Sequence, residues 1–187
     1  MSEIDLEVID RMMVRCGRRC CICRRFRPTK LQVHHIVERS QGGSDDEDNL
    51  INGRGGHDRL NGGDGDDDLF GETGNDTFYG GYGADTQTGG AGQDTFVFRH
   101  NTDSFWIAGK PADVIKDFQH GVDKIDLTEM DIPPANLYLL DGQTIDGQNY
   151  SYFGIDGNEN GLLDIGEFAV AVKMAPGGTL LMSDFLL

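Results

Sequence analysis

A nine-residue alternation of polar and apolar positions runs without a gap through residues 53–97. Each copy has six residues rich in glycine and aspartate, then three residues that suffice for a short strand whose middle side chain faces inward. The middle residues are Leu60, Leu69, Phe78, Gln87 and Phe96. Four of these five are apolar. The pattern therefore predicts stacked turns that bury a narrow core between two small parallel sheets, with Gln87 marking the weakest rung.

The polar part of the repeat suits a hard cation. The copies read GRGGHDRLN, GGDGDDDLF, GETGNDTFY, GGYGADTQT and GGAGQDTFV, with glycine first and fourth and aspartate sixth in each. Glycine permits positive φ and leaves carbonyl oxygens uncovered, and each aspartate adds a carboxylate oxygen and negative charge, which calcium prefers. The predicted calcium ligands are Gly53, Gly55, Asp58, Gly62, Asp64, Asp67, Gly71, Asp76, Gly80, Asp85, Gly89 and Asp94.

Two copies of the repeat complete one full coil. This places Asp58, Asp76 and Asp94 on one side of the stack, and Asp67 and Asp85 on the other. Stacked carboxylates repel one another until a cation lies between them. The same segment without calcium is therefore expected to be a disordered linker rich in glycine and aspartate.

The phrase G-G-x-G-x-D-x-(apolar)-x resembles the calcium-binding β-roll repeats of RTX proteins, among them secreted bacterial proteases, lipases, epimerases and toxins. Residues 113–127 contain D-x-I-x-D-F and G-x-D-K-I-D-L, which resemble the segment after the β-roll in serralysin-type proteases. The resemblance implies a mainly β fold, in which a parallel β-roll is continued by antiparallel β-sandwich strands. The chain contains no H-E-x-x-H motif, so the metalloprotease half of such proteins is absent.

Charge and composition agree with a cation-binding protein. The 187 residues include 27 glycines, about twice the usual ~7 %. The formal net charge of −16 is divided between +4 for residues 1–40 and −20 for residues 41–187. This acidic body repels nucleic acid and membrane surfaces and attracts divalent cations. No run approaches about 18 consecutive apolar residues, so no membrane span is predicted.

The basic head contains a second set of candidate ligands. Apolar residues at helical spacing predict a short helix over 4–14. Cys20 and Cys23 form a C-x-x-C pair that can supply half of a zinc site. Together with His34, His35 and the downstream Asn49, this pair resembles the front of an HNH endonuclease finger. That resemblance implies His34 as ligand of a catalytic metal such as zinc or magnesium, His35 as general base and Asn49 as the residue that orients the base's loop.

The finger departs from the HNH pattern in its second half. No cysteine follows Cys23, and His57, near the expected last ligand, belongs to the first glycine-rich repeat. Two interpretations remain open, a truncated structural finger and an active nuclease whose arginines contact phosphates. The cysteines at 16, 20, 21 and 23 lack distant partners and are left to bind zinc, to oxidise or to pair between chains.

A third metal signal lies at residues 156–167. Oxygen-bearing side chains stand at places 1, 3, 5, 9 and 12 of an EF-hand-like loop, namely Asp156, Asn158, Asn160, Asp164 and Glu167. The flanking residues 149–153 and 168–172 are β-formers, so strands and not helices are expected on both sides. The interpretation is a calcium-capable loop between strands, and the alternative is an acidic surface turn without an ion.

Both ends of the chain bear on localisation. The first 25 residues lack the apolar run of a secretory signal peptide. The last residues, Leu180 to Leu187, end in an acidic residue followed by apolar ones and resemble the type I secretion signals of serralysin-like proteins. The alternative is an ordinary final strand. The predicted divisions are a finger-like head at 1–51, a calcium-binding roll at 52–98 and a serralysin-type extension at 99–187.

Three functions follow from these patterns. The first is a calcium-binding module of a secreted, extracellular bacterial protein, which leaves through the type I secretion machinery and folds on calcium outside the cell. The second is an HNH-type metal-dependent endonuclease whose roll serves export or stability. The third is a module that binds a carbohydrate or a cell surface, with Tyr79, Tyr82 and Trp106 available to stack on a sugar.

Overall fold

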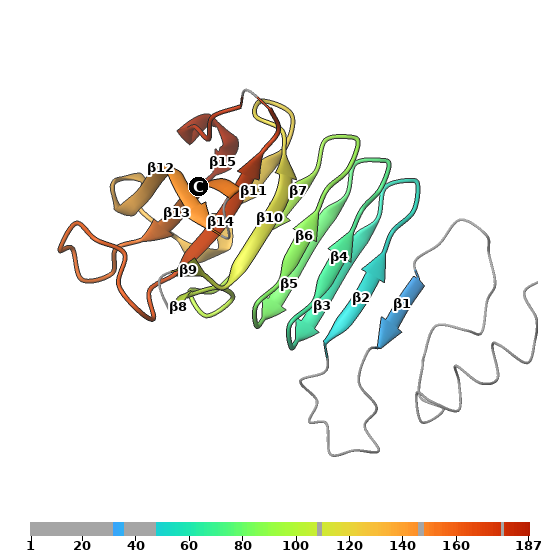
Figure 1. Cartoon of the computed structure of the whole chain (residues 1–187), viewed down its shortest axis with the longest axis horizontal. Helices are drawn as coiled ribbons and strands as arrows, with labels where there is room; N and C mark the ends of the chain where they lie inside the picture. The colour runs from blue at the N-terminus through green and yellow to red at the C-terminus, as the bar shows by residue number, and fades with distance from the viewer. Residues whose placement is uncertain (1–31, 36–47, 108–109, 146–147, 177) are drawn as a thin grey trace, which may run out of the picture.

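The computed structural model describes residues 32–35, 48–107, 110–145, 148–176 and 178–187. The helix expected at 4–14, together with Cys20 and Cys23, lies outside these ranges. The described residues form two facing sheets, one of eight strands and one of five, whose rungs stand side by side along the molecule (Figure 1). An additional two-stranded sheet joins β8 (Trp106–Ile107) to β9 (Lys110–Pro111).

The five repeats build the rungs of a parallel roll. Their strands are β3 (Arg59–Asp64), β4 (Asp68–Phe70), β5 (Thr77–Tyr82), β6 (Thr86–Thr88) and β7 (Thr95–Val97). The chain alternates between the sheets, so that β3, β5 and β7 join one sheet and β4 and β6 the other. Leu60 pairs with Phe78 and Leu69 with Gln87, two copies apart. The predicted parallel sheets and the two-copy coil are therefore confirmed.

A further rung precedes the first recognised repeat. Strand β2 (Asn49–Asn52) runs parallel to β4 and places Ile51 opposite Leu69. Strand β1 (Gln32–His35) then pairs antiparallel with β2, with His35 opposite Asn49. The predicted boundary between residues 51 and 52 thus falls inside a strand of the roll.

The segment after the repeats continues the roll in both sheets. The segment contains strands β10 (Asp113–Phe118) and β11 (Lys124–Asp126). They do not pair with each other, because β10 runs parallel to β6 and β11 runs parallel to β7. The reason lies in Ile115 and Ile125, which are fully buried like the middle residues of the repeats.

Beyond these rungs the eight-stranded sheet continues with antiparallel strands. Strand β14 (Ala169–Met174) lies parallel to β10, and β13 (Gln148–Ile155) and β12 (Leu137–Ile145) follow it as antiparallel neighbours. Strand β15 (Phe185–Leu186) ends the other sheet beside β11. Short 3-10 helices at Thr128–Met130, Pro134–Asn136 and Met182–Asp184 connect these strands. No helix in the described ranges is long and apolar enough to cross a membrane.

One continuous core joins the roll to the extension. The five predicted inward residues all have 0 % exposure. Phe78 and Phe96 stack with ring centroids 4.9 Å apart. Beyond them Phe98 contacts Phe153 and Phe168 edge to face. These aromatic contacts connect the last rungs to the antiparallel strands.

Gln87 interrupts this core, as its sequence position predicts. Its side chain is fully buried, and neither Nε2 nor Oε1 has a hydrogen-bond partner. An unsatisfied buried polar group costs about 1–3 kcal/mol. The expectation that Gln87 marks the weakest rung thus has a physical basis.

We expect Gln87→Met to stabilise the protein, because methionine keeps the volume and removes both unsatisfied groups. The free energy of unfolding should rise by about 1–3 kcal/mol, measured by urea unfolding at fixed solution conditions. The matched control is Gln93→Met at an exposed turn position, which should change little. A lower urea midpoint for Gln87→Met than for the parent would contradict the interpretation.

Candidate metal centres

Glycine is required at the fourth and first places of the repeat for two different reasons. Fourth-place glycines adopt positive φ, from 108° at Gly65 to 145° at Gly92. The second place also has positive φ and is occupied by non-glycine residues twice, at Arg54 with 72° and Glu72 with 73°. First-place glycines are needed because an aspartate oxygen lies where a side chain would begin.

The sixth-place aspartates stand in two columns, as predicted. The N–H of Asp58 donates to Asp76 Oδ1 at 2.8 Å, and the N–H of Asp76 donates to Asp94 Oδ1 at 2.9 Å. On the other side, the N–H of Asp67 donates to Asp85 Oδ1 at 2.9 Å. Each carboxylate is thereby fixed under the turn that precedes it by 18 residues.

Both columns extend beyond the repeats. The N–H of Asp85 donates to Asp113 Oδ1, and the N–H of Asp94 donates to Asp123 Oδ1, both at 3.0 Å. We name the columns by their members. Column one is Asn49, Asp67, Asp85 and Asp113, and column two is Asp58, Asp76, Asp94 and Asp123.

Asp113 and Asp123 were missed as candidate ligands by the sequence analysis. The signal that identifies them is the triplet aspartate-x-apolar, which Asp113 to Ile115 and Asp123 to Ile125 share with four of the five repeats. Neither glycine of the repeat is in place before Asp113, and only the fourth-place glycine, Gly121, precedes Asp123, so the full nine-residue phrase does not match.

In both columns, second carboxylate oxygens lie close to carbonyl oxygens of the next turn. Oδ2 is buried without a hydrogen-bond partner in Asp67, Asp76, Asp85, Asp94 and Asp113. A Cβ placed on Gly62 would meet both Asp67 Oδ2 and the carbonyl oxygen of Gly80 from the next turn. Gly71 lies in the same way against Asp76 Oδ2 and the carbonyl oxygen of Gly89. These converging oxygens are hard donors of the kind that calcium prefers.

Burial disfavours the ionised form of these carboxyl groups when no cation is bound. Desolvation by burial raises the pKa of Asp85 to about 7 and the pKa of Asp67 and Asp94 to about 6, and neighbouring carboxylates add to the rise. The pKa of Asp113 is raised well above its usual value for the same reasons. A divalent cation in the columns would favour the ionised forms, so the residues present fit calcium.

Carboxylates alone do not complete a metal site. Within the described ranges, no three His, Cys, Asp or Glu side chains are grouped closely enough to hold an ion. Each turn contributes one carboxylate to its column, so backbone carbonyl oxygens would supply most of the remaining ligands. This division agrees with the glycine-rich sequence of the turns.

Three other predicted ligands lie outside the buried columns. Asp64 is exposed at the end of β3, and Gly55 forms an isolated parallel bridge with Thr73. His57 is exposed, and its Nδ1 accepts a hydrogen bond from the N–H of Asn75 at 2.8 Å.

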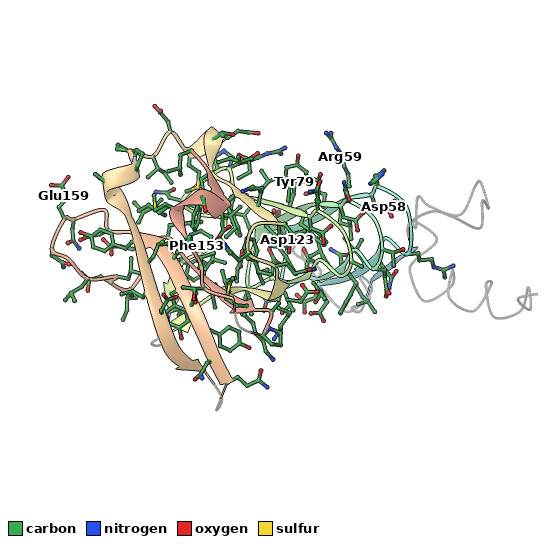
Figure 2. The ribbon with its side chains drawn as sticks, turned by 90° about the horizontal axis from the view of Figure 1, so that it is seen from above. Asp58, Arg59, Tyr79, Asp123, Phe153 and Glu159 are labelled. Atoms are coloured by element: carbon green, nitrogen blue, oxygen red, sulfur yellow. The ribbon has the colours of Figure 1, made fainter. Side chains whose placement is uncertain are left out.

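The loop at 156–167 joins β13 to β14, so the flanking strands are confirmed. Glu167 accepts hydrogen bonds from the N–H groups of Gly157 and Asp164, at 3.0 and 2.8 Å. The amides of Asn158 and Asn160 both donate to Asp164 Oδ2. Asp156 is buried and accepts from the N–H of Asn160 and Gly161. All five predicted oxygen ligands thus belong to one loop that is connected by hydrogen bonds. The tip of this loop, at Glu159, lies far from Asp58, towards the other end of the molecule (Figure 2).

Of the HNH-like residues, His34 and His35 lie on β1, and the backbone of His35 pairs with Asn49. Asn49 itself is buried and contacts the roll, since its N–H donates to Asp67 Oδ1 at 2.6 Å.

The family model of the C-terminal part of serralysins, peptidases of the M10 group, matches residues 32–165. The chain belongs to the serralysin C-terminal family. The predicted likeness to RTX β-rolls with a serralysin-type extension is thereby confirmed. The matched segment covers the roll with both of its columns and continues into the hairpin loop.

Solved structures agree with this membership of the serralysin C-terminal family. The chain matches the solution structures of the AlgE6R3 and AlgE6R2 subunits of the Azotobacter vinelandii mannuronan C5-epimerase, each with 26 % identity and a TM-score of 0.52. The AlgE6R3 match covers 74 % of this chain and 77 % of the subunit, and the AlgE6R2 match covers 71 % and 91 %. A search of curated proteins finds no match.

The raised pKa values predict how this serralysin C-terminal module responds to pH in a chelator. Between the ordinary aspartate pKa of 3.8 and about 7, the folded columns hold protons that the unfolded chain has released. Raising the pH across this interval therefore lowers the free energy of unfolding. We expect more β signal in circular dichroism at pH 4.5 than at pH 7.5.

Two variants control this experiment. Asp85→Asn removes one of the raised carboxyls and should weaken the pH dependence, whereas Asp68→Asn alters an exposed residue and should leave it unchanged. Stability that increases with pH in the chelator would show that the buried carboxyls do not govern folding.

Proposed function

We propose that this chain is a calcium-dependent folding module of a secreted bacterial protein. The observation that carries the proposal is the pair of columns in which buried carboxylate oxygens face glycine carbonyl oxygens without a hydrogen-bond donor between them. The sixth-place aspartates together with Asp113 and Asp123 would hold the ions. Calcium supplies the positive charge that the folded roll needs.

Calcium then acts as the trigger of folding, because it binds the stacked turns and not the extended chain. An ion bound with Kd ~10⁻⁴ M at about 1 mM calcium stabilises the folded state by about 1.4 kcal/mol. Several such sites together would add several kcal/mol to the stability of the folded state. At the low calcium concentration of the cytosol the same acidic turns repel one another and stay unfolded.

The C-terminal segment supports an order in which export precedes folding. Asp184 is fully buried and accepts hydrogen bonds from the Leu181 N–H and from His120 Nδ1, at 2.9 and 2.8 Å. Phe185 pairs with Ile125 in the five-stranded sheet. A type I secretion signal within these residues would be accessible to the secretion machinery only before the roll forms.

The module extends farther towards the N-terminus than the repeats. We place its start at Asn49 or earlier, and we place the finger-like head before it. The loop at 156–167 is proposed as an additional calcium site at the other end of the module, because hydrogen bonds within the loop connect Asp164 with Asn158, Asn160 and Glu167.

Binding of an acidic polysaccharide or a cell surface is a second candidate function. The structural neighbours belong to a mannuronan epimerase, and Tyr82 is 52 % exposed on β5. Tyr79 is less available, because Arg99 lies over its ring at 4.1 Å from the centroid.

The proposal is tested by a calcium titration followed by far-ultraviolet circular dichroism. We expect β signal to appear cooperatively in the parent. Asp76→Asn removes one charged ligand from the middle of column two and should raise the calcium midpoint on the order of tenfold, which corresponds to about 1.4 kcal/mol.

The matched control is Asp68→Asn, which removes an exposed carboxylate from β4 and should leave the midpoint within a factor of about two. A parent spectrum that is the same in calcium and in chelator would disprove calcium-dependent folding. Equal calcium midpoints for Asp76→Asn and the parent would show that the columns do not bind the calcium that drives folding.

A further inference from the structure

Column one contains one member that is not an aspartate. Asn49 occupies the place of the repeat aspartate, because its N–H donates to Asp67 Oδ1 at 2.6 Å and Ile51, two residues later, enters the core. Strand β2, which begins at Asn49, is a parallel neighbour of β4. The backbone of this first rung therefore follows the geometry of the repeats.

The side chain of Asn49 differs from its equivalents in one respect. Its Nδ2 donates to the carbonyl oxygen of Gly62 at 3.2 Å. The side-chain amide also forms a hydrogen bond with the carboxylate of Asp67. One NH₂ group thus connects the first-place carbonyl and the sixth-place carboxylate of the following turn.

The next step of the same column lacks such a donor. There Asp67 Oδ2 and the carbonyl oxygen of Gly80 approach one point, and Asp67 Oδ2 has no hydrogen-bond partner. Two electronegative oxygens that face each other require a cation or a donor between them. Asparagine and aspartate have nearly the same shape, so exchanging one oxygen for NH₂ turns this repulsion into a hydrogen bond.

We propose that the Asn49 side-chain amide takes the place of a cation at the first step of column one. Ion binding in this column then begins at the step from Asp67 to Asp85 and ends at Asp113. This inference rests on the proposed calcium-dependent function, and it defines where the ion array stops. The first rung is fixed by a neutral group, so it docks on the roll without an ion of its own.

The inference is tested by counting bound calcium ions in the full chain by native mass spectrometry at saturating calcium. Asn49→Asp restores a carboxylate at the first step, so this variant should hold one ion more than the parent. Asn61→Asp makes the same chemical change at an exposed position of β3, outside both columns. This control should bind the same number of ions as the parent.

A second variant distinguishes the contribution of the Asn49 side-chain amide from that of its backbone N–H. Asn49→Ala removes the side-chain amide, keeps the backbone N–H and adds no charge. This variant should therefore keep the ion count of the parent and require more calcium to fold. A gain of one ion by Asn49→Asp alone, with parent-like β signal in circular dichroism, supports the inference.

Three results would overturn it. These are an unchanged ion count in Asn49→Asp, an equal gain in Asn61→Asp, and an Asn49→Asp variant that lacks the parent's β signal in saturating calcium. A parent that binds no calcium would refute the proposed function together with this inference. That result is distinct from a calcium-loaded parent whose count Asn49→Asp does not change.

Discussion

The structure depends on like charges that are buried in register. Parallel stacking with a fixed repeat brings one carboxylate under the next in each column, and Oδ2 of Asp67 and Asp76 is buried beside a carbonyl oxygen of the next turn. Such an arrangement is unfavourable by itself, because burial and mutual repulsion both oppose ionisation. The proposed calcium ions would supply the positive charge that relieves both effects.

The apolar core of the roll is narrow. Each rung contributes one inward side chain, such as Leu60 or Phe78, and burial of one such side chain is worth about 1.5–3 kcal/mol. Gln87 places an unsatisfied amide where another apolar group would stand, so this rung contributes less to the core than its neighbours.

The sequence predicts the parts of this fold that obey a strict period. Five aspartates and five inward residues recur every nine positions, so their sides of the coil follow from spacing alone. Asp113 and Asp123 were not predictable in this way, because they lie 28 and 29 residues after their partners and not 18. Their membership of the columns is decided by tertiary pairing, when Ile115 and Ile125 reach the core and align β10 and β11 with the existing rungs.

A stack of identical turns has no intrinsic end, so its terminal rungs need a different chemistry. At the C-terminal end the aromatic cluster of Phe98, Phe153 and Phe168 covers the last rungs without requiring an ion. At the N-terminal end of column one, Asn49 on β2 donates hydrogen bonds to Asp67 and to the carbonyl oxygen of Gly62. An aromatic cluster at one end and an amide at the other leave the unpartnered carboxylate oxygens in the turns between them.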